Sequence, residues 1–207
     1  MTQPNANLLT MQDIMPNDQF LRQRPALLDE MIALKKMRRL FLGPTMSVLF
    51  ENKRLMWWQV QEMLRVEGGG TDQAVDELAV YNPLIPSRLR LTATLMIEIA
   101  DPVVRSDTLA ALSGLTRHVF LTVGTHRIPA YTVCVDGDCV DDGPVGDQNP
   151  TSSVHFLSFV LSDDQRAVFD TQRPCLVCDH PAYRHTQEWP DALWHAVKHD
   201  AKDHVGQ

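Results

Sequence analysis

The sequence lacks the motifs by which common nucleotide-dependent and hydrolytic enzymes are recognised. It has no G-x-x-x-x-G-K phosphate loop, no G-x-G-x-x-G dinucleotide fingerprint and no G-x-S-x-G nucleophile elbow. It also has no run of 18 or more apolar residues, and its beginning lacks the basic, apolar and small-residue order of a signal peptide. These absences favour a cytoplasmic protein that does not contact a membrane, and they assign no reaction to it.

Aromatic residues are few, at 7% of the chain, and the 19 Lys and Arg residues are outnumbered by 26 Asp and Glu residues. The 207 residues are 44% hydrophobic, which is enough for one buried core, so we predict a single domain over residues 1–207. Within it we expect a loose tail at 1–10 and an acidic loop at 136–152. The net charge is −7, and this acidic total argues against nonspecific binding to nucleic acid, which requires neutralisation of phosphates.

The positive charges gather in the first third of the chain. Up to Gly70 there are nine Lys and Arg against seven Asp and Glu, and after it ten against nineteen. One basic cluster falls where a helix is predicted to end: Lys35, Lys36, Arg38 and Arg39. Cations at a helix C-terminus complement the helix dipole, which accounts for the cluster without a ligand. A phosphate or anion site at this cluster is the alternative.

The apolar periodicity of the first half predicts helices with one strand between them. We expect a short helix capped by Asn17 or Asp18, and a second from Pro25 to about residue 39. A buried strand follows at 46–50. The next helix begins after Phe50 and ends at the glycines 68–70, and another covers 71–81.

The second half is richer in strands. Residues 89–99 alternate apolar and polar side chains, which is typical of an antiparallel sheet whose apolar face is covered by helices. Further strands are predicted at 119–123, 128–135, 154–161 and 176–178, with helical segments at 102–114, 163–171 and 190–202. The predicted fold class is α+β, with N-terminal helices packed on a mainly antiparallel sheet and short helices inserted between its strands.

The block 50–86 carries the densest set of polar side chains beside apolar ones. Gln59, Glu62 and Arg65 share one stripe of the predicted helix, because residues three apart lie on one face. One interpretation is a solvated stripe with a weak ion pair. The other is a ligand pocket between this helix and the sheet, which Glu98 joins if the polar side of its strand faces the helix. The residues of that predicted pocket are Glu51, Gln59, Glu62, Arg65, Tyr81, Asn82 and Glu98.

The four cysteines form two close pairs, Cys134 with Cys139 and Cys175 with Cys178. Four thiolates can hold a tetrahedral zinc ion. Isolated buried thiols are the alternative, since Cys175 and Cys178 would point to opposite faces of an extended strand. A di-iron centre of the bundle type is not predicted, because no glutamate has a histidine three residues on.

Several segments together resemble a known family: LTMQDI, IALKKMRR, QVQEMLRVE, DELAVYNPLIP, LTATLMIEI, SVHFLSF and DHPAY. Across about residues 9–200 the chain is similar to an uncharacterised bacterial and archaeal family of unknown function. The genes of that family are often found beside rubrerythrin and a heterodisulfide-reductase-like iron–sulfur protein. The resemblance implies a cytoplasmic role in redox or oxidative-stress metabolism, with an iron–sulfur or rubrerythrin-type partner.

Three hypotheses about function follow. The first is a ligand-binding or accessory module that forms a homo-oligomer. The second is an enzyme or metalloprotein that uses Glu51, Glu62, Arg65 and Glu98 as a polar site. The third is a protein whose four cysteines hold a structural zinc ion.

Overall fold

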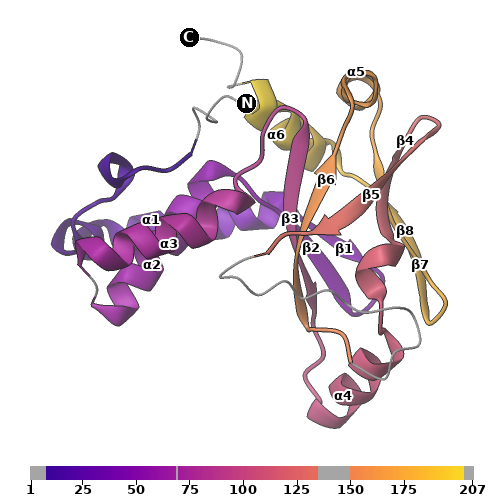
Figure 1. The fold of residues 1–207 in the computed structure, drawn as a ribbon, viewed down its shortest axis with the longest axis horizontal. Helices are drawn as coiled ribbons and strands as arrows, with labels where there is room; N and C mark the ends of the chain where they lie inside the picture. Colours follow the sequence, from indigo (N-terminus) through magenta and orange to yellow (C-terminus); the bar gives the residue numbers. More distant parts are fainter. Residues whose placement is uncertain (1–7, 69, 135–149, 203–207) are drawn as a thin grey trace.

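The computed structural model describes residues 8–68, 70–134 and 150–202, and its fold is α+β, as predicted (Figure 1). Neighbouring strands in the sheet are all antiparallel, in the order β1-β2-β3-β6-β5-β4-β7-β8. The strands are β1 (Arg39–Leu42), β2 (Met46–Phe50), β3 (Arg90–Ile97), β4 (Val119–Val123), β5 (His126–Thr132), β6 (Val154–Val160), β7 (Cys175–His180) and β8 (Tyr183–Glu188). The helices are η1 (Met11–Asp13), α1 (Asn17–Arg38), α2 (Lys53–Glu67), α3 (Thr71–Tyr81), η2 (Asn82–Leu84), α4 (Pro102–Ala111), η3 (Leu115–His118), α5 (Asp163–Thr171) and α6 (Asp191–Lys202).

The sheet curls until its two edge strands, β1 and β8, come into contact. Tyr183 on β8 donates its hydroxyl to the carbonyl of Leu42 at 2.6 Å and accepts the Thr45 N–H at 3.2 Å. Gly43, in the turn after β1, lies against this contact with a φ of 70°. A Cβ at this position would lie 2.6 Å from both the Tyr183 hydroxyl and His185 Cδ2, so the closure of the sheet requires glycine here.

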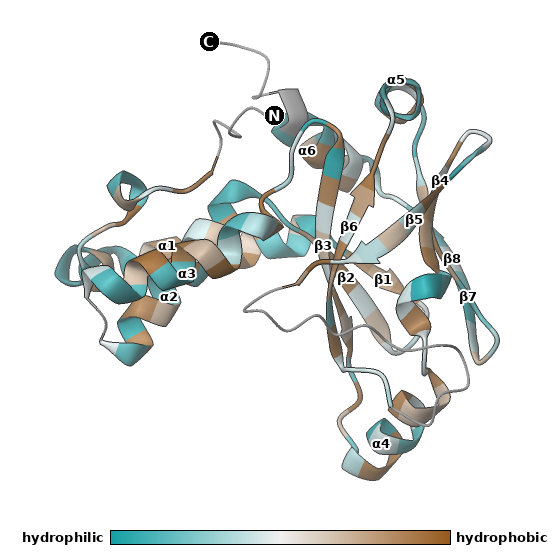
Figure 2. Cartoon of the chain, viewed as in Figure 1, coloured by the Kyte–Doolittle hydropathy of each residue, from teal (hydrophilic) through white to brown (hydrophobic). Residues whose placement is uncertain are grey.

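The inner face of the curled sheet forms the larger of two cores. Alternate residues of β3, namely Leu91, Ala93, Leu95 and Ile97, point into it and pack with Phe50, Trp189 and other buried side chains. In Figure 2 the strands mix hydrophobic and hydrophilic colours, and brown is prominent in β6. The curl buries this face largely against itself, and α5 and α6 complete the core with Phe169, Leu193 and Val197.

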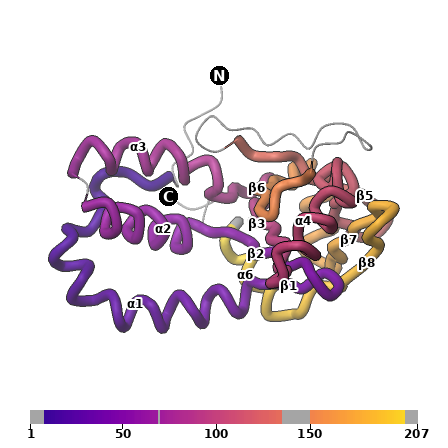
Figure 3. Tube along the Cα trace, turned by 90° about the horizontal axis from the view of Figure 1, so that it is seen from below, coloured from indigo at the N-terminus to yellow at the C-terminus, as the bar shows by residue number. Residues whose placement is uncertain are grey.

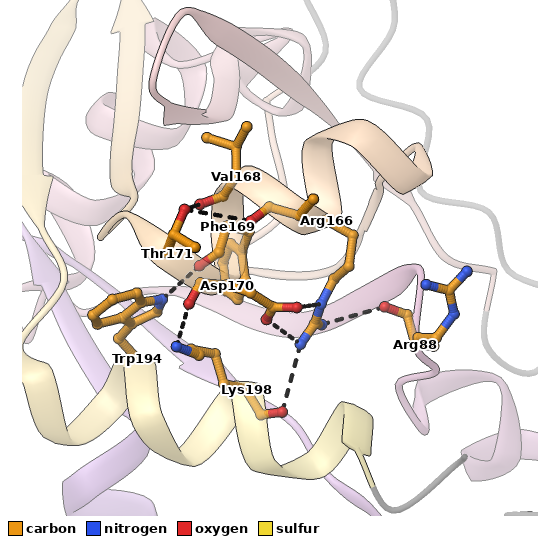
Figure 4. A network of polar contacts seen from close by, with 9 residues as sticks. Arg88, Arg166, Val168, Phe169, Asp170, Thr171, Trp194 and Lys198 are labelled. Carbon is orange, nitrogen blue, oxygen red and sulfur yellow. Dashed lines mark hydrogen bonds and ion pairs between the residues drawn. The ribbon is translucent and has the colours of Figure 1, made fainter.

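Helices α5 and α6 are joined by a network of polar contacts (Figure 4). Arg166, which is buried, pairs with Asp170 at 2.8 Å and donates to the backbone carbonyls of Arg88 and Lys198. Trp194 donates its indole N–H to the carbonyl of Phe169 at 2.8 Å, and the Lys198 amine donates to the carbonyl of Asp170. These bonds satisfy the charge and the carbonyls that the contact buries.

Helices α1, α2 and α3 lie together on the outer face of β2, β3 and β6 (Figures 1 and 3). The second core forms there, from Leu49, Met96 and Phe156 of the sheet and from helix residues such as Phe20 and Trp58. The prediction that helices cover the apolar face of the 89–99 strand holds for α5 and α6, which contribute to the same core, but not for α1, α2 and α3. These three helices cover its other side, which carries Thr92, Thr94 and Met96.

Two predictions about the N-terminal region were also wrong. Residues 17–38 form one continuous helix with Pro25 inside it, since Pro25 is exposed and the carbonyl that loses its helical N–H partner can bond to water. Residues 8–10 are not a loose tail. Leu9 is buried, and its backbone N–H and carbonyl both bond to the side chain of Asn82. Residues 1–7 and most of the predicted acidic loop, 135–149, lie outside the described residues.

Candidate functional site

A pocket of about 250 Å³ lies between the outer face of the sheet and helices α1, α2 and α3. Its floor is a row of side chains set by the strand register. Arg39 pairs with Leu49, Leu49 pairs with Thr94, and Thr94 pairs with Phe156, on β1, β2, β3 and β6 in turn. Residues directly opposite one another on neighbouring strands share a face, so all four line the pocket.

The walls of the pocket come from the helices. Lys35 of α1, Leu55, Met56 and Gln59 of α2, Tyr81 of α3 and Leu84 of η2 complete it. Helix α2 begins immediately after β2 because Asn52 caps it, accepting the Leu55 N–H on its side-chain oxygen at 2.9 Å. This short connection places Glu51 between strand and helix, against the pocket.

Glu51 is the least solvated charged group of the pocket, with 4% of its surface exposed. Its Oε1 accepts the Thr94 hydroxyl at 2.6 Å, whereas its Oε2 is buried without a hydrogen-bond partner among the described residues. Burial raises the pKa of the Glu51 carboxyl to about 7, and the Thr94 hydrogen bond and the charges of Arg38 and Lys35 offset only part of that shift. Near neutral pH this carboxyl can therefore hold or release a proton.

The charged and titratable groups around Glu51 come from every element packed on it. Helix α1 supplies Lys35 and Arg38, β1 supplies Arg39, α3 supplies Tyr81, and α6 supplies Asp200 from the opposite side. Arg38 is fully buried, and its guanidinium group holds neighbouring segments together. It donates to the carbonyls of Phe50 at 2.8 Å and Glu51 at 3.0 Å and pairs with Asp200.

Two cations line the pocket at the junction of α1 and β1. Arg39 pairs with Glu98 at 3.2 Å, and its side chain is 31% exposed. Lys35 lies four residues earlier and is partly buried, and within the described ranges its amine has no carboxylate within ion-pair distance. With one of the two charges unpaired, this end of the pocket favours a negative group.

Three of the residues predicted to form a ligand pocket line it: Glu51, Gln59 and Tyr81. The amide of Gln59 is 3.5 Å from the Tyr81 hydroxyl, to which it donates. Glu62 and Arg65 do not line the pocket. Glu62 accepts Arg24 of α1 at 2.7 Å and Arg65 at 3.1 Å, so this part of the predicted stripe ties α2 to α1.

Asn82 and Glu98, which were also predicted to line the pocket, lie outside it. Asn82 binds the backbone of Leu9, as described above. Glu98 accepts the Ser47 hydroxyl and pairs with Arg39, so it adjoins a lining residue without lining the pocket itself. The four side chains proposed as an enzyme site, Glu51, Glu62, Arg65 and Glu98, are thus not brought together, and Glu51 alone of them lines the pocket.

The sequence interpretation missed Lys35, Arg39 and Thr94 as pocket residues. Lys35 and Arg39 belong to the basic cluster that was interpreted as a complement to the helix dipole. Their closeness at the end of a predicted helix was the available signal, because Lys35 in the last turn of α1 and Arg39 at the start of β1 lie at the same junction. Thr94 belongs to the polar side of β3, which could be assigned to the site only after the helices were placed on that side.

The three cysteines that lie within the described residues are not brought together in one site. Cys134 is disulfide-bonded, whereas Cys175 and Cys178 have free thiols. On β7 Cys178 is buried among the core residues and Cys175 lies on the other face. Burial raises the pKa of the Cys178 thiol to about 11, which opposes the thiolate that zinc requires. Cys139 lies outside the described residues, and among those described no three His, Cys, Asp or Glu side chains are grouped to hold a metal.

Comparison with known proteins places the chain in a family. Residues 8–201 match the family described as protein of unknown function (DUF3501). The chain belongs to this family. Among solved structures, this DUF3501 protein is similar to a crystal structure described as a novel protein of unknown function from Burkholderia pseudomallei K96243. The two are 29% identical, the match covers 93% of this chain and 98% of that one, and the TM-score is 0.82.

No curated protein matches the DUF3501 chain. Within its described ranges, none of the helices combines the length and apolarity needed to cross a membrane.

Proposed function

We propose that this DUF3501 protein binds a small organic molecule in the pocket between α1, α2, α3 and the sheet. The observation that carries the proposal is a pocket of about 250 Å³ whose lining includes Glu51, a buried carboxyl with no hydrogen-bond partner for its Oε2 among the described residues. A buried polar atom without a partner costs roughly 1–3 kcal/mol, so a ligand group that reached this carboxyl would be stabilised by it. Ligand sites are typically apolar hollows with a few polar groups, and this pocket has that composition.

A blocked-pocket variant tests this proposal. A library of small organic molecules is screened for those that raise the melting temperature of the protein. Gln59→Trp places a large ring in the pocket, and we expect it to abolish the stabilisation by every true ligand. Gln23→Trp makes the same change on an exposed turn of α1 and should leave binding intact. Ligands that stabilise Gln59→Trp as strongly as the native protein would show that the pocket is not their site.

A second candidate is an enzyme in which Glu51 acts as a general acid–base. Its support is the pKa of about 7 in a pocket open to a ligand, since a catalytic acid or base works best near the operating pH. A bound ligand that is converted to product, with turnover lost and binding kept in Glu51→Gln, is the result expected. Unchanged turnover in that variant would exclude this role of Glu51.

The redox setting is a separate part of the proposal, supported by the gene neighbourhood that the resemblance implies. We propose that the protein is a homo-oligomer that works in the cytoplasm in redox or oxidative-stress metabolism. In this role it engages an iron–sulfur or rubrerythrin-type protein. Co-expression with each type of neighbour, followed by native mass measurement of the purified material, tests both the partner and the oligomer. A monomer that purifies alone from both co-expressions would count against each.

A further inference from the structure

The pocket has a charged end and an apolar end. Along its floor the order across the strands is Arg39, Leu49, Thr94 and Phe156. Adjacent strands are about 4.8 Å apart, so the backbones of Arg39 and Phe156 are separated by about 14 Å. Lys35 adds a second cation near Arg39, while Met96 adds to the apolar surface near Phe156. The lining therefore suits a molecule that is negative at one end and apolar at the other.

We propose that the ligand is an organic monoanion, a carboxylate with an apolar body. Its carboxylate would lie between Lys35, Arg39 and Glu51, and its apolar part would lie over Leu49 and Phe156. This inference rests on the proposed function and specifies the ligand class for the same pocket.

The protonation state of Glu51 supports an anion over a cation. With a proton the Glu51 carboxyl is neutral, so it does not repel a ligand carboxylate that lies beside Lys35 and Arg39, and it can donate a hydrogen bond. A charge-assisted bond of this kind is short and strong. An amine at the same place would meet Glu51 favourably, but it would also face the positive charges of Lys35 and Arg39.

The apolar part of the pocket sets the other half of the ligand. Leu49, Leu55, Met56, Leu84, Met96 and Phe156 supply its aliphatic and aromatic lining. Burial of each methylene of a ligand there contributes about 0.8 kcal/mol, so affinity should rise with chain length until the pocket is full. A small inorganic anion has no such contribution and should bind weakly.

Matched probes test the ligand class by isothermal titration calorimetry on the full chain at pH 6. Hexanoate and benzoate are compared with 1-hexanol and benzyl alcohol, which keep the apolar body and lack the charge, and with hexylamine, which reverses it. We expect the carboxylates to bind about tenfold or more tightly than the alcohols, since one charge-assisted hydrogen bond is of that size. Alcohols or the amine binding as tightly as the carboxylates would overturn the inference.

Two lysines in the last turn of α1 give a matched pair of variants. Lys35→Met should weaken hexanoate binding about tenfold, because it removes a lining cation. Lys36→Met removes an exposed cation that does not line the pocket and should change affinity less than about twofold. Equal effects of the two variants would mean that the anion responds only to the general positive field, and would refute the site.

The outcomes also separate this inference from the proposed function. If the alcohols bind as tightly as the carboxylates and Gln59→Trp abolishes their binding, the pocket takes small molecules and the carboxylate preference is wrong. If the carboxylates bind equally to Gln59→Trp, they bind elsewhere and the inference fails. If neither these probes nor any library member binds, the proposed function fails and the inference fails with it.

Discussion

Replacement of Glu51 by glutamine gives the most direct test of how the pocket is built. Glutamine has the shape of the protonated carboxyl and keeps an oxygen to accept the Thr94 hydroxyl, which bonds Glu51 at 2.6 Å. It cannot ionise. The variant therefore fixes the site in its neutral form at every pH, and any difference between the two proteins that depends on pH comes from the Glu51 proton.

The size and sign of that difference follow from the raised pKa. Burial moves the carboxyl from its ordinary 4.5 to about 7 in the folded protein, so between these values the folded state holds a proton that the unfolded state has released. The free energy of unfolding therefore falls as pH rises through this window, and the loss is complete above the folded pKa. A shift of this size corresponds to about 3 kcal/mol, since each pKa unit is 1.36 kcal/mol.

Urea unfolding followed by tryptophan fluorescence at pH 4.5, 6 and 8 measures the effect. We expect Glu51→Gln to match the native protein at pH 4.5 and to be more stable than it by about 3 kcal/mol at pH 8. Other groups titrate equally in both proteins, so their contributions cancel in the difference. A stability difference that does not change with pH, or that favours the native protein more at pH 8, would refute the raised pKa.

Three further changes test the fold around the pocket. Arg38→Met should cost about 3–5 kcal/mol in urea unfolding, because it leaves two carbonyls and a carboxylate without their buried partner, whereas Arg22→Met breaks an exposed pair and should cost about 0.5 kcal/mol or less. Gly43→Ala should lower stability by at least about 2 kcal/mol more than Gly68→Ala. Both glycines have a positive φ, but only at Gly43 would the new Cβ meet other atoms, and equal losses would contradict the closure of β1 on β8. Pro25→Ala should raise the melting temperature, with a gain of about 1 kcal/mol or more, because it restores a backbone hydrogen bond inside α1; a lower melting temperature would argue against a continuous helix.

Local patterns predicted most of the helices and strands. The alternation at 89–99 identified β3, and the capped stretch after Phe50 identified α2 together with its end at Gly68, which has a φ of 65°. Strand β8 was missed because only its first residue, Tyr183, is buried, so its sequence shows no apolar alternation. Strand β1, which contacts β8 where the sheet closes, was not predicted either. Its residues were assigned to the end of the preceding helix and to the turn that follows.

The site depended on a choice that the sequence left open. Alternation shows that β3 has an apolar face and a polar face, but it does not show which face α1, α2 and α3 cover. Closure of the sheet on itself decides this, and it rests on long-range contacts such as Tyr183 with Leu42. Once the polar face is assigned to the helices, Glu51, Gln59 and Tyr81 fall into the pocket, and Glu62 and Arg65 fall on the side of α2 that meets α1.

The same proton on Glu51 links stability to the binding of an anion. A ligand carboxylate favours the protonated form of Glu51, so by linkage its binding raises the pKa of Glu51 further and takes up a proton above pH 7. The other groups that face Glu51, Lys35, Arg38, Arg39, Tyr81 and Asp200, add the background field in which this occurs. Carboxylate affinity should therefore fall as pH rises from 6 to 9 in the native protein and change much less in Glu51→Gln. An affinity that falls equally in both would place the responsible proton on another group and separate the stability effect of Glu51 from ligand binding.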